Sequence, residues 1–156
     1  MWQLYHFPLC PFSRKVQLVL SEKKVPFALQ LAYPWEDDDR FHSLNPAGKT
    51  PVLHNAERRL VLIDSQAICE YFEETEAKSP LIPGSAAARA EVRRLTALFD
   101  DGLYGDVTEP LIYEKMKKRL ILRQSPDSGV LRAAMRLTHE HLDYLDWLIG
   151  IPWNKK

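Results

Sequence analysis

The chain has 156 residues, of which 46% are hydrophobic and 27% are charged, a composition typical of a globular protein and too apolar for a disordered one. Its 21 lysines and arginines balance its 21 aspartates and glutamates, which argues against a nucleic-acid-binding protein that works by neutralising phosphates. No apolar run is long enough to cross a bilayer, and the N-terminus lacks the pattern of a signal peptide. With two cysteines, Cys10 and Cys69, we expect no disulfide framework, no membrane association and a reducing cytoplasmic location.

The chain begins with alternating strand and helix signals. Residues 3–6 are a strand candidate, two prolines then mark a loop, and from Phe12 apolar residues recur at helical spacing. The charged residues of this helix, Lys23 among them, are expected away from its apolar face. Pro26 ends the helix, and residues 27–31 predict a second strand. This order and spacing predict a parallel βαβ unit.

The pattern continues with a second helix, a hairpin and a third helix. Residues 36–44 form a short helix candidate with an acidic first turn, which suits the helix dipole. Residues 50–54 and 59–63 flank a polar connection and predict an antiparallel hairpin. Helical spacing then covers residues 66–75. The expected order is therefore βαβ, α, ββ, α, an α/β domain over residues 1–78.

No strand signal follows this first domain. Residues 79–85 combine prolines and a glycine and are the expected linker. Helical patterns then cover residues 86–103, 111–122 and 130–149, and Pro110 is expected to bend or interrupt the helical run. Residues 86–156 therefore predict an all-α domain.

Cys10, in the sequence Cys-Pro-Phe-Ser, is the sharpest chemical feature. It lies between the first strand and the first helix, where backbone N–H groups and the helix dipole stabilise a thiolate over a thiol. Ser13 occupies the place of a second cysteine, so no internal disulfide forms here. Cys10 is the candidate nucleophile for thiol–disulfide exchange. Ser13 is the alternative catalytic residue, because its hydroxyl could donate a hydrogen bond to a bound thiolate. The simpler interpretation is that Cys10 is a small loop residue and Ser13 a helix-capping residue.

Two further motifs could bind a small peptide-like ligand, one by pairing with the ligand's backbone and the other by binding its charged groups. Thr50-Pro51 starts a strand, and a cis bond would leave the Thr50 backbone able to pair with an extended peptide, although sequence alone favours trans. Asp64 and Ser65 open a helix, where Ser65 can donate to a carboxylate and Asp64 can hold an ammonium group. The simpler interpretation of this pair is a helix N-cap.

The remaining candidates are weaker. His6 can polarise Cys10 but is more simply a strand-end residue, and Cys69 is expected to pack inside a helix. His139 and His141 are two residues apart, so they cannot form a metal pair on one helix face, and we expect no metal site. The basic run at residues 115–119 is expected to be a solvated helix face. Trp35 and the acidic residues after it are a candidate partner contact.

Taken in order, these motifs resemble the glutathione S-transferase superfamily. The resemblance rests on the Cys10 motif, on Asn-Pro-Ala-Gly-Lys-Thr-Pro at residues 45–51, and on Asp-Ser-Gln-Ala-Ile at residues 64–68. It implies a thioredoxin-like domain over residues 1–78 that binds glutathione as a cosubstrate, followed by a helical domain. It also implies a cis bond before Pro51 and a homodimer.

The resemblance assigns roles to individual positions. The Thr50 backbone would pair with the cysteinyl part of glutathione, and Asp64 with Ser65 would hold its γ-glutamyl end. Cys10 matches the thiol-reactive position of the cysteine-type members, which favour glutathione-dependent reduction, with Ser13 as the second candidate for catalysis. The expected ligand-binding residues are Phe12, Lys49, Thr50, Pro51, Asp64 and Ser65.

A narrower resemblance suggests a different function. Residues 33–36, the helix at residues 91–95, residues 106–119 and residues 141–154 look like a bacterial subgroup that includes a dimeric cell-division protein binding the FtsZ filament. In that protein the fold serves as an interaction scaffold. The family's helical domain is longer, and no Ser/Thr-x-x-Asp cap follows Leu148, so this domain looks incomplete. The sequence therefore leaves two hypotheses, a glutathione-dependent transferase and a scaffold without turnover.

Overall fold

The computed structural model describes residues 1–36, 38–82 and 84–150. They form two compact units, the first spanning Met1–Ala88 and the second beginning at Arg89. The division falls just after the linker predicted at residues 79–85, within helix α4 (Ala86–Ala97). Residue 83 of that linker and the resemblance seen at residues 151–154 lie outside the described residues.

A mixed sheet of four strands forms the centre of the first unit. The strands are β1 (Trp2–His6), β2 (Phe27–Leu31), β3 (Val52–Asn55) and β4 (Leu60–Ile63), in the order β2-β1-β3-β4. The β1–β2 pair is parallel, whereas β1–β3 and β3–β4 are antiparallel. Both the predicted βαβ unit and the predicted hairpin are therefore confirmed.

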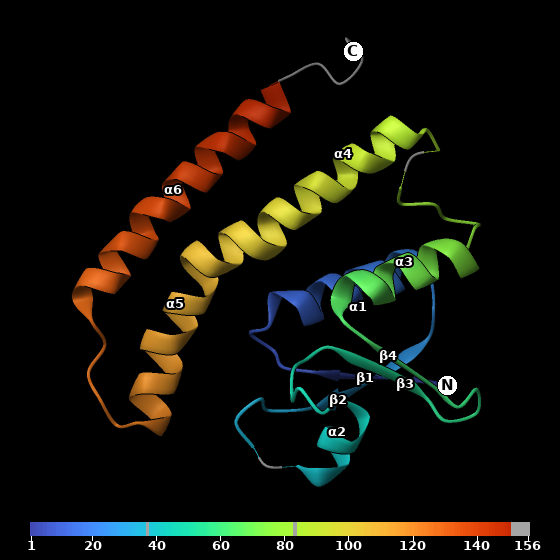
Figure 1. The fold of residues 1–156 in the computed structure, drawn as a ribbon, viewed down its shortest axis with the longest axis horizontal. Coiled ribbons are helices and arrows are strands. Elements are labelled where there is room, and N and C mark those ends of the chain that lie inside the picture. Colours follow the sequence, from blue (N-terminus) through green and yellow to red (C-terminus); the bar gives the residue numbers. More distant parts are fainter. Residues whose placement is uncertain (37, 83, 151–156) are drawn as a thin grey trace. The chain divides into compact units, whose positions relative to one another are not determined.

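Three helices cover the two faces of this sheet, as Figure 1 shows. Helices α1 (Pro11–Glu22) and α3 (Ser65–Thr75) lie side by side on one face, and α2 (Asp39–Leu44) lies on the other. Helix α2 begins three residues later than the pattern predicted. The Asp38 carboxylate accepts hydrogen bonds from the amides of Arg40 and Phe41, so it caps the helix and sets its start.

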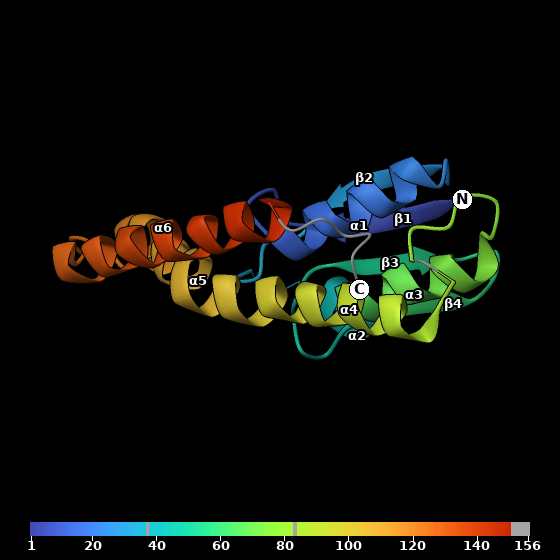
Figure 2. The same cartoon turned by 90° about the horizontal axis from the view of Figure 1, so that it is seen from above.

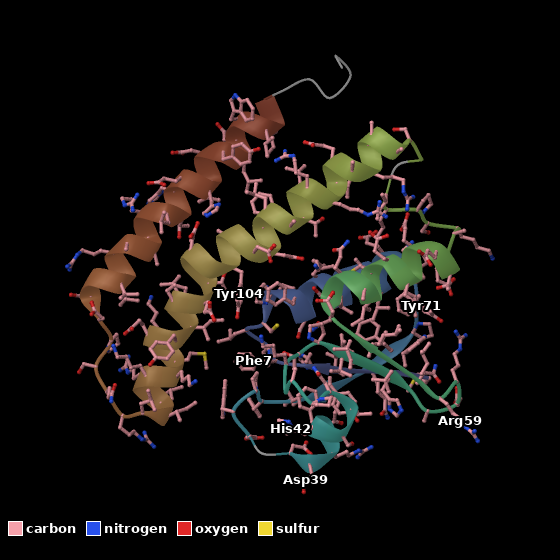
Figure 3. All side chains as sticks on the ribbon, viewed as in Figure 1. Phe7, Asp39, His42, Arg59, Tyr71 and Tyr104 are labelled. Carbon is pink, nitrogen blue, oxygen red and sulfur yellow. The ribbon has the colours of Figure 1, made fainter. Side chains whose placement is uncertain are left out.

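Alternation along the strands divides the core into two layers. Between the sheet and α1 with α3, the side chains of Leu4, Leu53 and Phe72 are buried together; Figure 3 labels Tyr71, which packs against them from α3. On the α2 face, Tyr5 packs against Phe41, with ring centroids 5.8 Å apart. These layers hold the strands in place. Of the predicted site residues, Cys10 follows β1, Thr50 and Pro51 precede β3, and Asp64 and Ser65 follow β4.

Lys23 contradicts its expected place on the solvent-facing side of α1. Its side chain is fully buried and its Nζ lies 2.8 Å from the Glu73 carboxylate. The same ammonium donates to the carbonyl oxygens of Glu76 and Ser79. The prediction was wrong because Lys23 lies seven residues after Val16 and four after Val19, so helical spacing places it on the apolar face, where Glu73 and two carbonyl oxygens bind its ammonium.

The second unit contains helices and no strand among the residues that the structure describes. From α4 the chain continues through π-helical η1 (Leu98–Thr108), α5 (Glu109–Ile112) and π-helical η2 (Tyr113–Ile121) to α6 (Ser128–Gly150). Pro110 lies within a continuous helical run, in the short helix α5 between η1 and η2, and bends the run without interrupting it, which is one of the two outcomes expected. The run changes direction near α5 (Figure 1), and α6 returns along η1 and α5 (Figure 2). In none of the described helices is an apolar stretch long enough to cross a membrane.

Candidate functional site

Cys10 is the N-cap residue of α1, and its sulfur has two partners. The Ser13 amide donates to Cys10 Sγ at 3.4 Å, and the thiol donates to the Thr50 carbonyl oxygen at 3.5 Å. A ligand that takes over the Thr50 carbonyl oxygen would release the sulfur from its contact with this main chain. Cys10 is half-buried, which leaves it accessible to a small molecule.

Ser13 lies one turn into α1 and points inward. It is fully buried, and its hydroxyl has no hydrogen-bond partner among the described residues. The two catalytic candidates are therefore close in sequence but differ in burial, since Cys10 is half-buried and Ser13 is fully buried. Phe12, between them, is half-buried.

The bond between Thr50 and Pro51 is cis, as the family resemblance implied and contrary to what the local sequence favoured. Both residues are buried at the start of β3. No described residue accepts a hydrogen bond from the Thr50 amide. The main chain of Thr50 therefore lies beside Cys10 and can pair with an extended ligand backbone.

The turn before Thr50 is held by local bonds. Asn45 Nδ2 donates to the Lys49 carbonyl oxygen at 2.7 Å, and Asn45 Oδ1 accepts from the Ala47 amide at 3.1 Å. Gly48 has a φ of +62°, and a Cβ there would lie 2.8 Å from a ring carbon of His42, which Figure 3 labels on α2. The turn therefore requires glycine, and it presents the exposed Lys49 next to the cis bond.

Asp64 and Ser65 form the start of α3, as predicted. Asp64 Oδ1 accepts hydrogen bonds from the Gln66 and Ala67 amides at 2.8 and 3.0 Å, so the N-cap interpretation is confirmed. The backbone of Asp64 has a φ of +76° and a ψ of 131°, which lies outside the left-handed helical region and is rare for any non-glycine residue. Ser65 is buried at the first helical position. Asp64 is itself exposed, so capping leaves the carboxylate open to solvent.

An aromatic cluster that sequence reasoning did not assemble joins the loops that follow β1 and β2. The ring of Phe7 packs edge-on against Trp35, with centroids 5.1 Å apart, and Tyr33 packs beside both. Trp35 remains 41% exposed. Phe7, labelled in Figure 3, immediately follows β1, and its carbonyl oxygen accepts from the Cys10 amide at 2.9 Å. The sequence feature that could have predicted this cluster is the two-residue spacing of Tyr33 and Trp35 directly after a strand.

Other sequence candidates lie apart from this chemistry. The Nδ1 of His6 contacts Gln17 Nε2 at 3.4 Å, and burial lowers the pKa of His6. Cys69 packs against the core of the first unit, as expected. In the second unit His141 bonds to Asp106 at 3.0 Å. A cavity of about 310 Å³ lies at the N-terminal end of β1, lined in part by Trp2, so it is distinct from the Cys10 end of that strand.

Comparison with known proteins assigns the family. Residues 4–80 match the family model described as glutathione S-transferase, N-terminal domain. FtsZ-localized protein A of Caulobacter vibrioides is 43% identical over 157 residues, which cover 94% of this chain and 68% of that protein.

Solved structures agree with this match. A glutathione S-transferase from Rhodospirillum rubrum has a TM-score of 0.89 and 44% identity, over 96% of this chain and 66% of that one. A glutathione S-transferase from Methylobacillus flagellatus, solved with glutathione bound, has a TM-score of 0.72 and 27% identity, over 94% of this chain and 69% of that one. The chain spans about two thirds of the length of these relatives. It belongs to the glutathione S-transferase superfamily, with a thioredoxin-like first unit and a helical second unit.

Proposed function

We propose that this protein binds glutathione at the end of β1 and uses Cys10 in glutathione-dependent thiol transfer. The observation that carries the proposal is the contact between Cys10 Sγ and the Thr50 carbonyl oxygen, 3.5 Å long, beside the cis bond to Pro51. It brings a thiol next to a backbone that can hold a peptide. The proposal includes a cytoplasmic location, where reduced glutathione would be at hand.

The residues present suit the three parts of glutathione. The Thr50 main chain would pair with the cysteinyl part and so direct its sulfur toward Cys10. Ser65, at the start of α3, would donate to the γ-glutamyl carboxylate, a position that helix N-termini favour for anions. The exposed carboxylate of Asp64 would face the ammonium group, while Phe12 and Lys49 would flank the tripeptide.

The proposed reaction is thiol–disulfide exchange on a glutathione mixed disulfide. The Cys10 thiolate attacks the glutathione sulfur; a bond forms between these two sulfurs as the disulfide bond breaks, and the other thiolate leaves and takes up a proton. A second glutathione thiolate then attacks the glutathione sulfur held on Cys10. Cys10 is released as a thiolate and oxidised glutathione is formed, so the electrons balance.

Access is the reason for preferring Cys10 over Ser13. An in-line attack needs the nucleophile at the surface, and the hydroxyl of Ser13 is fully buried. Transfer of glutathione to an electrophile by the bound thiolate is the alternative reaction within the same proposal, and there Cys10 would only donate a hydrogen bond. The two reactions differ in whether a covalent Cys10–glutathione adduct forms.

The test begins with binding. We expect glutathione to raise the melting temperature of the wild-type protein and to give a binding isotherm in calorimetry. Ser65→Ala should weaken binding about tenfold through the loss of one hydrogen bond to a charged group. Ser21→Ala, at the exposed far end of α1, is the matched control and should bind as the wild type does. A protein that shows neither stabilisation nor heat with glutathione contradicts the proposal.

The chemical step is tested separately. With a glutathione mixed disulfide as substrate, Cys10→Ser should abolish turnover. When the wild-type protein is trapped with this substrate, its measured mass should increase by one glutathione, and Cys10→Ser should prevent this increase. Cys69→Ala should retain both. If Cys10→Ser turns over as the wild type does, Cys10 is not the nucleophile.

A scaffold function is the second candidate, because the relative with 43% identity is named as FtsZ-localized. The surface features that would serve it are the half-exposed Trp35 and the exposed cations Lys115, Lys117 and Arg119 of η2. In co-sedimentation with FtsZ filaments, the triple reversal of these cations to glutamate should abolish binding, whereas Lys78→Glu should not. Filament binding without glutathione binding would favour the scaffold.

A further inference from the structure

The cavity of about 310 Å³ at the N-terminal end of β1 takes no part in the chemistry proposed for Cys10. All the residues that line it belong to the first unit, and they come from the start of β1, the segment after α1, the β3–β4 hairpin and the end of α3. Its volume is at the lower end of the range of small-molecule sites. Val25 and Pro26 contribute apolar lining, while Lys24 and Arg58 contribute positive charge.

Two of the cations at this cavity are left without a carboxylate partner. The buried Lys23 ammonium is already bound to a carboxylate, and the ammonium of Met1 lies 2.8 Å from Glu57 Oε2. Within the part of the chain that the structure describes, neither Lys24 nor Arg58 forms a salt bridge. An anionic group in the cavity would give both of them a partner.

Arg58 is held in place by the β3–β4 hairpin and by an aromatic ring. Its amide donates to Asn55 Oδ1 at 3.1 Å, and its guanidinium carbon lies 5.8 Å from the centroid of the Trp2 ring. A cation–π contact uses the charge of the guanidinium but none of its five N–H donors. These donors therefore remain available to an oxyanion, which arginine can bind through two parallel hydrogen bonds.

Lys24 occupies a backbone position that glycine usually fills. Its φ is +56°, its amide donates to the Ser21 carbonyl oxygen at 3.0 Å, and the Val25 amide donates to the Leu20 carbonyl oxygen at 2.9 Å. These are the bonds of a Schellman motif, in which glycine is preferred because it has no Cβ. A lysine here carries a conformational cost that its backbone bonds do not require, which points to a role for its side chain at the cavity.

We infer that this cavity binds a phosphate monoester with a short organic part. A phosphate monoester carries about two negative charges at neutral pH, which match the two cations better than the single charge of a carboxylate does. Its oxygens suit the bidentate donors of Arg58, and Val25 and Pro26 would contact the organic part. The site lies at the opposite end of β1 from Cys10, so it does not depend on glutathione binding.

Calorimetry of the full chain with phenyl phosphate and with inorganic phosphate, at equal ionic strength, tests the site. We expect both compounds to bind, and phenyl phosphate to bind more tightly because its ring adds apolar contact. Tighter binding of inorganic phosphate would overturn the ester and assign the cavity to the free ion. A protein that gives no heat with either compound would overturn the site itself.

Neighbouring arginines provide a matched pair of variants. Arg58→Gln should weaken the binding of phenyl phosphate about tenfold, because it removes hydrogen bonds to a charged group. Arg59→Gln removes the same charge from the same hairpin, at a residue that Figure 3 labels and that does not line the cavity, so it should bind as the wild type does. Glu76→Gln removes an acid that borders the cavity and should tighten binding. Equal weakening by the two arginine variants would show attraction to general positive charge and contradict a site at the cavity.

Lys24→Gly separates binding from stability. Glycine suits the positive φ of this position, so the melting temperature without ligand should stay the same or rise. Phenyl phosphate binding should nevertheless weaken about threefold, because one charged partner is lost at a solvent-accessible position. Glutathione binding should be unchanged in Lys24→Gly and in Arg58→Gln, since that site lies at the other end of the sheet. Unchanged phenyl phosphate binding would exclude Lys24 from the cavity's function.

Discussion

The two units of this protein are stabilised in different ways. The first has a central sheet with buried side chains on both faces, and residues such as Leu4, Leu53 and Phe72 are almost inaccessible to solvent. In the second unit only Val107 and Ala134 are buried hydrophobic residues among those described, and the helices meet along half-buried side chains. The first unit should therefore respond to core truncation, and the second to loss of its polar contacts.

Phe72→Ala is the change that should break the first unit most severely. The Phe72 side chain is 1% exposed and packs edge-on against Trp2, with centroids 5.4 Å apart. Its removal leaves a cavity under the sheet and should lower the free energy of unfolding by about 3–5 kcal/mol, measured by urea denaturation. Leu120→Ala, at an exposed leucine of the second unit, should change it by less than about 0.5 kcal/mol. If Phe72→Ala and Leu120→Ala lowered the free energy of unfolding equally, the proposed difference between the two units would be wrong.

Glu73→Gln should have the next largest effect. The Glu73 carboxylate binds Lys23 and accepts the amides of Leu81 and Ile82, so it ties α1, α3 and the following segment together. The side chain is 6% exposed. Leaving the Lys23 ammonium buried without its carboxylate should cost about 3 kcal/mol. Glu74→Gln, at the exposed next residue, is the matched control.

The same pair predicts a pH dependence. Burial alone would raise the pKa of Glu73, but the hydrogen bonds from Lys23 and from the Ile82 and Leu81 amides outweigh it and hold the pKa below its usual value. Its contribution to stability is therefore complete above the pKa of an unfolded glutamate and is lost as the pH falls through the lower folded value. Glu73→Gln should lack this acid-side loss, which urea denaturation across that pH range would reveal.

Glu114→Gln should have a smaller effect, confined to the second unit. The Asp127 amide donates to the Glu114 carboxylate at 2.6 Å and Lys118 binds it at 3.0 Å, so Glu114 holds the segment before α6. The bond from the Asp127 amide, opposed by burial and aided by Lys118, lowers the pKa of Glu114. The stability that Glu114 contributes is likewise complete above the pKa of an unfolded glutamate, and it is lost as the pH falls through the lower pKa of Glu114 in the folded protein.

Hydrogen exchange would locate the effect of Glu114→Gln. The Asp127 amide should exchange faster in the variant, while amides of β1 and β3 keep their protection. Glu109→Gln, an exposed acid of α5, should change neither. Faster exchange throughout the first unit would show that the two units do not respond separately.

The parts of the structure that were predicted correctly from the sequence are those with a regular pattern of apolar residues. The apolar runs on either side of the polar connection between β3 and β4, and the helical spacing after Phe12, are such patterns, and both elements were predicted correctly. The place of Lys23 was not predicted correctly: its spacing from Val16 and Val19 puts it on the apolar face, but a lysine is seldom buried without a partner, and its partner Glu73 lies fifty residues away. The cis bond before Pro51 has no local signature either, and only the family resemblance suggested it.

The candidate site was predictable in its parts but not in its contacts. Helix starts at Cys10 and Asp64 follow from capping chemistry, and the structure has both residues as N-caps. The contact of Cys10 with Thr50 joins residues forty positions apart, and the burial of Ser13 depends on how α1 packs on the sheet. Neither can be obtained from spacing along the chain.

Asp64 offers the smallest and most selective test, because its capping and its proposed ligand contact can be separated. Asp64→Ala removes the acceptor for the Gln66 and Ala67 amides and places alanine at a positive φ, so it should lower the free energy of unfolding by about 1 kcal/mol. Asp64→Asn keeps a good cap and a residue that tolerates this backbone, so stability should hold. It removes the charge that would face the ammonium of glutathione, so binding should weaken in calorimetry while the melting temperature without ligand stays the same. If Asn binds glutathione as well as Asp does, the carboxylate is a helix cap alone.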